Sequence, residues 1–233
     1  MSIVSTTTDK NGKQSLVVNT ENNLDWYNLN TGQSGIREPA TALTDVAREA
    51  NNLSKMDAGK VAISIQDKEG NYSTYYPRET DRGDIALMPS STDQIDKGKE
   101  PIYFNKKYEL QDNGKVKRDD KTDEPLYFYI MNKDTDAAKD LLANIKINEF
   151  TRQNDQPGFS IATRVSLHNP DLLKEINEYQ KTPDDNSKTI AVISKDGIEI
   201  ATQKEFSERK AEKTAQAEKT QEATKSVDAG MDR

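Results

Sequence analysis

The sequence predicts an α+β fold in which antiparallel β-hairpins pack with about three helices, followed by an exposed charged C-terminal helix or tail. Three observations support this prediction. Short glycine-containing turns lie between β-prone runs, and three other segments have apolar residues at helical spacing. Residues 207–226 contain no apolar side chain larger than Ala, so this segment has no apolar seam with which to join a packed core.

The β-prone runs alternate with turns that contain glycine. Asn-Gly and Asp-Gly pairs supply the positive φ angles of type I′ and related turns, so each of them favours a hairpin. In Val61–Ile65 the apolar residues occupy alternate positions, which places them on one face of a strand. The turns that define the predicted hairpins are residues 9–12, 67–71, 112–114, 156–158 and 196–197.

Three segments have the apolar stripe of a helix packed on one side. The first is Thr41–Asp57, and Gly59 follows it as the residue that suits the left-handed position at a helix end. The second begins near Asp134 or Thr135, both of which are good N-caps. The third has Pro170 in its first turn, where a missing N–H does no harm.

Composition divides the chain into four parts. Residues 1–76 form an N-terminal α+β unit, and residues 102–203 form a C-terminal one. Between them, residues 77–101 hold three prolines and a brief apolar patch, which is typical of a polar loop or a domain linker. Residues 204–233 form a charged, low-complexity helix or tail, rich in Ala, Glu, Lys and Gln.

The residues that are missing exclude several chemistries. The 233 residues include no Cys and one His, so disulfides, thiolate nucleophiles and three-histidine zinc sites are excluded. There are 33 Lys and Arg against 40 Asp and Glu, which gives a net charge of −7. No apolar run approaches the ~20 residues of a membrane span, and no secretory signal is visible. We therefore expect a cytoplasmic protein with no cofactor and no membrane partner.

Few residues could support catalysis. His168 is the single possible imidazole base, but it directly precedes the third helix, and Gly32–Gly35 lacks the spacing of a nucleophile elbow. The tripeptide Arg82-Gly83-Asp84 is too short to indicate integrin binding. Carboxylates can hold a metal ion or transfer protons, but these clusters fall in predicted loops: Asp119, Asp120, Asp123 and Glu124; Asp184 and Asp185; Asp81 and Asp84.

Aromatic and basic residues are interleaved in the second half of the chain. Aromatic rings beside Lys and Arg on a sheet bind single-stranded nucleic acid, by stacking on bases and neutralising phosphates. Strands also bury alternate residues, so half of these rings are expected in the core. The candidate nucleic-acid-binding residues are Tyr103, Lys106, Lys107, Tyr108, Lys115, Lys117, Arg118, Tyr127 and Tyr129.

The function that these observations favour is that of a non-catalytic interaction protein, similar in role to an adaptor or inhibitor. Several hairpins imply several sheet edges, and an exposed edge can accept a strand of a partner protein. The acidic surface can also steer a basic partner. Two alternatives stay open: a module for single-stranded nucleic acid, and a carboxylate- or metal-dependent hydrolase.

Overall fold

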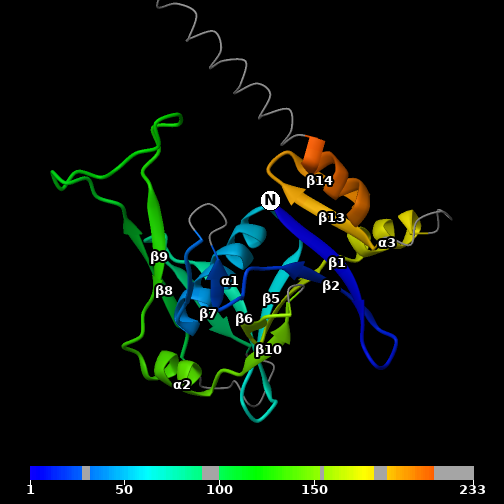
Figure 1. Cartoon of the computed structure of the whole chain (residues 1–233), viewed down its shortest axis with the longest axis horizontal. Helices are drawn as coiled ribbons and strands as arrows, with labels where there is room; N and C mark the ends of the chain where they lie inside the picture. Colours follow the sequence, from blue (N-terminus) through cyan, green and yellow to red (C-terminus); the bar gives the residue numbers. More distant parts are fainter. Residues whose placement is uncertain (28–31, 91–99, 153–154, 181–187, 213–233) are drawn as a thin grey trace, which may run out of the picture. The chain divides into compact units, whose positions relative to one another are not determined.

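The computed structural model describes residues 1–27, 32–90, 100–152, 155–180 and 188–212. These residues form an α+β structure of mostly antiparallel strands, which confirms the prediction of a broadly α+β fold (Figure 1). The helices are α1 (Pro39–Lys55), α2 (Asp136–Asn144), α3 (Pro170–Tyr179) and a fourth that includes residues 203–212. The strands are β1 (Ser2–Thr8), β2 (Gln14–Asn19), β3 (Asp25–Tyr27), β4 (Ser34–Ile36), β5 (Lys60–Gln66), β6 (Tyr72–Glu79), β7 (Ile85–Pro89), β8 (Ile102–Tyr108), β9 (Tyr127–Met131), β10 (Ile147–Thr151), β11 (Pro157–Ile161), β12 (Thr163–His168), β13 (Thr189–Ser194) and β14 (Gly197–Thr202).

The described residues form two compact units. The smaller unit consists mainly of Ile3–Thr6 and the described residues from Pro170 onward, and the larger unit consists mainly of Thr7–Asn169. The four-part division expected from the sequence stays a prediction.

The larger unit is built on seven strands in the order β2-β12-β5-β6-β7-β8-β9, and neighbouring strands are antiparallel. Strand β12 lies between two strands from the first third of the chain: Val165 is opposite Val18 on one side and Ile63 on the other. These three residues are buried and share one face of the sheet. Alternation of side chains along each strand therefore defines a buried face and an open face.

Helices α1 and α2 both pack on the buried face. Helix α1 contacts β5, β6, β7 and β9, and its Lys55 pairs with Glu79, which shares a face with the buried Tyr75. Helix α2 places Leu141 beside a cavity that Ile65 also lines. Seven apolar residues of α1 are buried, as its predicted stripe requires: Ala40, Ala42, Leu43, Val46, Ala47, Ala50 and Leu53.

The helix boundaries differ in detail from the predicted ones. Helix α1 begins at Pro39, because proline is favoured in a first turn, and ends at Lys55. The left-handed residue just after it is Asp57, with φ of 52°, and not Gly59. For α2, the predicted cap is confirmed, since the Thr135 hydroxyl accepts a hydrogen bond from the Ala138 N–H at 3.2 Å.

Residues 77–90 differ from the expected polar loop. Residues 77–79 continue β6, and the short apolar run Ile85–Pro89 is the central strand β7, paired with both β6 and β8. Pro77 is tolerated because its nitrogen faces β5, where the pairing of β5 with β6 has ended at Tyr75. Residues 91–99, in the rest of the expected loop, lie outside the described part.

The smaller unit has the strand order β14-β13-β1, and β13 and β14 form the hairpin predicted at the 196–197 turn. A capping box begins its last helix. The side chain of Glu205 accepts hydrogen bonds from the Thr202 N–H at 2.7 Å and from the Tyr179 hydroxyl at 2.9 Å, while the Glu205 N–H donates to the Thr202 hydroxyl at 3.1 Å. Arg209 of this helix forms an ion pair with Glu199 of β14.

Candidate functional site

Strand β9 forms one end of the seven-strand order and has an unpaired edge among the described residues. A backbone hydrogen bond toward β8 lies just beyond each end of β9. The Glu109 N–H donates to the Leu126 carbonyl at 2.9 Å, and the Asn132 N–H donates to the Tyr103 carbonyl at 2.8 Å. Hydrogen-bonded pairs alternate in an antiparallel ladder. The N–H and C=O groups of Tyr127, Tyr129 and Met131 therefore point away from β8, toward the open edge.

The strand itself contains none of the residues that usually protect an exposed edge. Tyr127, Phe128 and Ile130 are 47%, 44% and 46% exposed, and the strand contains no charge, proline or glycine. Natural edge strands are protected by charged residues, prolines, bulges or a covering element. An apolar edge with free backbone groups is therefore suited to pairing with another strand.

A groove follows the edge of β9 and has α1 as its second wall. Its volume is about 320 Å³. The helix contributes small and hydroxyl-bearing side chains, which leave room between the helix and the strand. The lining residues of α1 are Ala40, Thr41, Thr44, Asp45 and Arg48, and those at the strand are Phe128, Tyr129, Ile130, Met131 and Lys133.

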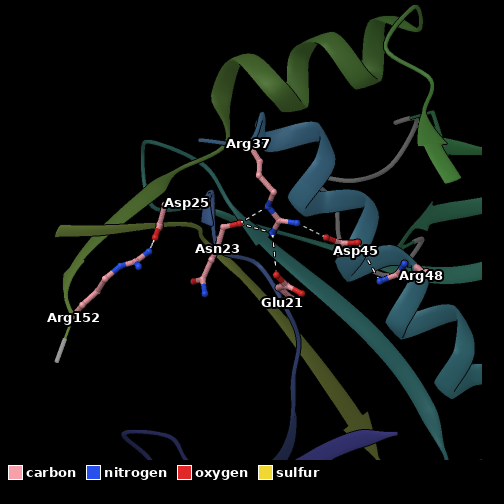
Figure 2. Close-up of polar contacts among 7 residues, drawn as sticks. All are labelled: Glu21, Asn23, Asp25, Arg37, Asp45, Arg48 and Arg152. Carbon is pink, nitrogen blue, oxygen red and sulfur yellow. Dashed lines mark hydrogen bonds and ion pairs between the residues drawn. The ribbon is translucent and has the colours of Figure 1, made fainter. Parts of the chain in front are cut away.

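A charge network fixes the wall that α1 contributes (Figure 2). Asp45 accepts a hydrogen bond from the guanidinium of Arg37 at 2.5 Å and pairs with Arg48 at 3.2 Å. Arg37 also donates to the Asn23 carbonyl, with 3.0 Å from its Nε, and lies 3.9 Å from Glu21. Because Asp45 is held between two arginines, the helix wall carries no unpaired carboxylate.

A second ion pair holds the segment from which the Asn23 carbonyl projects. Arg152 pairs with Asp25, as Figure 2 shows, and Asp25 accepts a hydrogen bond from the Phe159 N–H at 2.8 Å. Residues 22–25 are thereby attached to β11, and the Asn23 carbonyl is held where Arg37 can reach it. Nothing in the sequence pattern indicated this network, because its members come from five separate segments.

The predicted nucleic-acid-binding residues are divided between the two faces of the sheet. Lys106, Tyr108, Tyr127 and Tyr129 share the face of the buried Phe104, whereas Tyr103 and Lys107 lie on the open face. On the first face the Lys106 ammonium lies 4.0 Å from the ring centre of Tyr127 and 5.6 Å from that of Tyr108. This lysine therefore lies against the rings of the helix-covered face.

Tyr129 occupies the centre of this aromatic cluster. Its hydroxyl donates to the Gly83 carbonyl at 3.3 Å, and its ring meets that of Tyr127 edge to face at 5.7 Å between centres. Burial, together with the negative charge of Glu79 and Asp84 nearby, raises the pKa of Tyr129 to about 12. The hydroxyl therefore stays protonated at neutral pH and acts as a hydrogen-bond donor.

The remaining predicted cations lie in residues 109–126, between β8 and β9. Lys117 pairs with Glu109 at 3.5 Å, and Arg118 pairs with Asp123 at 3.5 Å. Lys115 is exposed, and its N–H donates to the side chain of Asn113. Carboxylates of the same segment thus neutralise two of these three cations.

The candidate catalytic residues lie at a strand end, in a turn and between two strands. His168 ends β12, and its side chain is exposed. Hydrogen bonds from the Thr122 and Lys121 N–H groups lower the pKa of Asp119, which closes a turn. Asp84 accepts the Lys106 N–H at 2.8 Å between β7 and β8. Asp184 and Asp185 lie outside the described residues. Within the described ranges, no three His, Cys, Asp or Glu side chains are placed to hold a metal ion.

A group of five carboxylates lines a cavity of about 500 Å³ between α2 and the β5–β6 turn. They are Asp67, Glu69, Glu100, Asp136 and Asp140. Partial burial raises the pKa of Asp67, but hydrogen bonds from Asn71 and the turn backbone outweigh it, so the net pKa is lowered. A general acid requires the opposite shift. Asp140 accepts from the Asn144 amide at 2.8 Å, so it too has a local partner.

The features of the larger unit that stand out are thus a strand edge with free backbone groups and a neutral groove beside it. In the part of the chain that the structure describes, no helix is both long and apolar enough to cross a membrane. Comparison with known proteins gives no further guide to the function of this edge, because the chain matches no family model, no curated protein and no solved structure.

Proposed function

We propose that the chain is a non-catalytic interaction protein that binds an extended segment of a partner protein along the edge of β9. The observation that carries this proposal is the outward direction of the backbone groups of Tyr127, Tyr129 and Met131. An added strand forms hydrogen bonds with these groups, which gives affinity, and its side chains contact the surfaces on either side, which gives specificity.

The surroundings of the edge define the partner segment. On the open face its side chains meet Phe128 and Ile130, so β-branched or aromatic residues are favoured there. On the other face they meet Thr41 and Thr44, which leave space for small residues. The segment is uncharged at its centre, because Asp45 and Arg48 are paired with each other. The net charge of −7 steers partners whose remaining surface is basic.

A matched pair of variants tests this proposal. Tyr129→Pro and Tyr129→Ala both remove the ring, but only proline also removes the outward N–H. Peptides are selected on the wild-type chain from a phage-displayed random library, and their affinities are measured by fluorescence polarisation. We expect Tyr129→Pro to reduce the affinity at least about tenfold more than Tyr129→Ala, because proline both loses a ladder hydrogen bond and obstructs the approaching strand.

Circular dichroism and thermal unfolding of both variants provide the control, since the Tyr129 N–H makes no bond to β8 and its loss leaves the sheet intact. Equal affinities for the two variants would contradict strand addition at β9. Failure to select any peptide, together with a dimer that Tyr129→Pro dissociates, would show that the edge pairs with a second copy of this chain instead of a partner.

A further inference from the structure

The strands of the larger unit differ in charge from the rest of the chain. The protein has 40 Asp and Glu, but the seven strands contain one carboxylate, Glu79, and it pairs with Lys55 on the helix-covered side. The acidic residues are concentrated in turns and helices. The same strands contain five basic residues: Lys60, Arg78, Lys106, Lys107 and Arg164.

Four of these five basic residues lie on the open face. Arg164 is opposite Ser64, and Arg78 is opposite Ala86, both away from the buried residues of the same strands. Lys60 and Lys107 follow the same alternation. All four are exposed, and among the described residues none has a carboxylate partner. An acidic protein therefore presents one sheet face on which the strands contribute only positive charge.

Aromatic rings accompany these cations. The Lys60 ammonium lies 4.7 Å from the ring centre of Tyr76 on the neighbouring strand. Lys107 is directly opposite Phe128, which is 44% exposed. Tyr103, which is 36% exposed, is opposite Ala86, and Ala86 is in turn opposite Arg78. A ring and a cation thus recur together from β5 to β9, over about 19 Å at the usual strand spacing of ~4.8 Å.

A polar groove continues this face at the β2 end. Its volume is about 710 Å³, and it is lined largely by hydroxyl and amide side chains, with Arg164 and Lys10 as its cations and Asp9 as its carboxylate. The Arg164 guanidinium donates to the Ser15 hydroxyl at 3.4 Å. The other lining residues are Ser64, Gln66, Tyr72, Asn148, Ala162, Thr163 and Ser166.

We propose that this open face binds single-stranded nucleic acid. Lys60, Arg78 and Lys107 neutralise phosphates, and bases stack on the exposed rings beside them. The combination favours this ligand, because one molecule supplies both the phosphates that pair with the cations and the bases that stack on the rings. Phe128 lines the groove between β9 and α1 but none of the three cations does, so the charge variants test this inference separately from strand addition at β9.

The test compares two variants with equal changes in charge. In the first, Lys60, Arg78 and Lys107 are each changed to Glu; in the second, Lys115, Lys117 and Arg118 are. The probes are fluorescein-labelled oligo(dT) and oligo(rU) of about 15 nucleotides, near the upper site size of one small sheet domain. Binding is measured by fluorescence anisotropy between 50 and 300 mM salt at about neutral pH.

We expect the open-face variant to lose at least about tenfold in affinity and the loop variant to lose less than about threefold. For the wild-type chain, the logarithm of affinity should fall with the logarithm of salt with a slope of about −2 to −3, because each neutralised phosphate contributes about −0.7. Replacing Tyr103 and Phe128 with Ala should weaken binding by at least about fivefold, because the stacked bases lose their platform.

Three results would overturn the inference. One is the absence of wild-type binding at 50 mM salt, and another is an equal loss in the two charge variants, which would show a response to net charge alone. The third is equal affinity for a sulfated polysaccharide with no effect of the ring variants, which would show a general polyanion surface. Thermal unfolding checks that each variant is folded.

Discussion

At the scale of single residues, Gly59 occupies a backbone position that a side chain would strain. Its φ angle is 129°, and a Cβ atom added to it would lie 2.7 Å from the carbonyl oxygen of His168. Gly12 also has a positive φ, of 79°, but a Cβ there meets nothing within 4 Å. A comparison of substitutions at the two positions therefore separates the cost of backbone strain from the cost of steric overlap.

We expect Gly12→Ala to lower the free energy of unfolding by about 1–2 kcal/mol, the usual cost of a side chain in left-handed backbone. Gly59→Ala should cost more, because the overlap with the His168 carbonyl adds to that strain. Urea unfolding followed by circular dichroism measures both. A Gly59→Ala variant as stable as Gly12→Ala would show that the β12 end moves aside without cost.

Leu43 tests the packing of α1 at the same scale. It is fully buried, whereas Leu110 is 63% exposed. Leu43→Ala should lower the free energy of unfolding by about 2–5 kcal/mol through the cavity it leaves. Leu110→Ala should change it by less than about 0.5 kcal/mol. Equal effects in urea unfolding would be incompatible with α1 packed on the sheet.

At the scale of elements, local chemistry could predict where strands and helices lie. The turns at 67–71 and 196–197, the Thr135 cap and Pro170 each act over a few residues, so the sequence pattern was sufficient for them. The turn predicted at 156–158 was wrong, because Pro157 and Gly158 belong to β11 and pair with Thr151 and Phe150. Lys106 and Lys107 show what it could not supply. They are adjacent in sequence but lie on opposite faces, and which face is open depends on α1, more than fifty residues earlier in the chain.

The capping box of the last helix provides a prediction for an element. Thr202→Ala removes a hydroxyl that accepts the Glu205 N–H, so the first turn should lose about 1 kcal/mol. Hydrogen exchange of amides in residues 203–212 of the full chain should therefore accelerate. Ser207→Ala is the control, because the Ser207 hydroxyl donates to a carbonyl within the helix and caps no terminal N–H.

The same helix should respond to pH. Hydrogen bonds from the Thr202 N–H and the Tyr179 hydroxyl lower the pKa of Glu205 in the folded chain. The ionised Glu205 carboxylate therefore stabilises the helix fully above the pKa of Glu in the unfolded chain, near 4.3. This stabilisation is lost as the pH falls through the lower pKa that Glu205 has in the folded chain. Amide exchange in 203–212, corrected for intrinsic rates, should accelerate over that range in the wild type. A Glu205→Gln variant should not show this acceleration.

At the scale of the whole molecule, the uncharged edge of β9 limits the protein concentration that can be reached without self-association. Ile130→Lys places a charge on β9, and Ile36→Lys adds the same charge at a residue that is 77% exposed on β4. We expect only Ile130→Lys to reduce concentration-dependent light scattering, because a lysine on an edge opposes strand pairing. Equal effects of the two variants would indicate a response to net charge.

The position of β12 has a consequence for synthesis of the chain on the ribosome. Residues 163–168 form β12, which lies between β2 and β5 in the sheet. Strands β2 and β5 are synthesised early, but the strand that joins them leaves the ribosome much later. Such distant pairing slows folding, because a long loop must close before any contact rewards it. A nascent chain halted before residue 163 should remain sensitive to protease, whereas one extended far enough to expose residue 168 should become resistant.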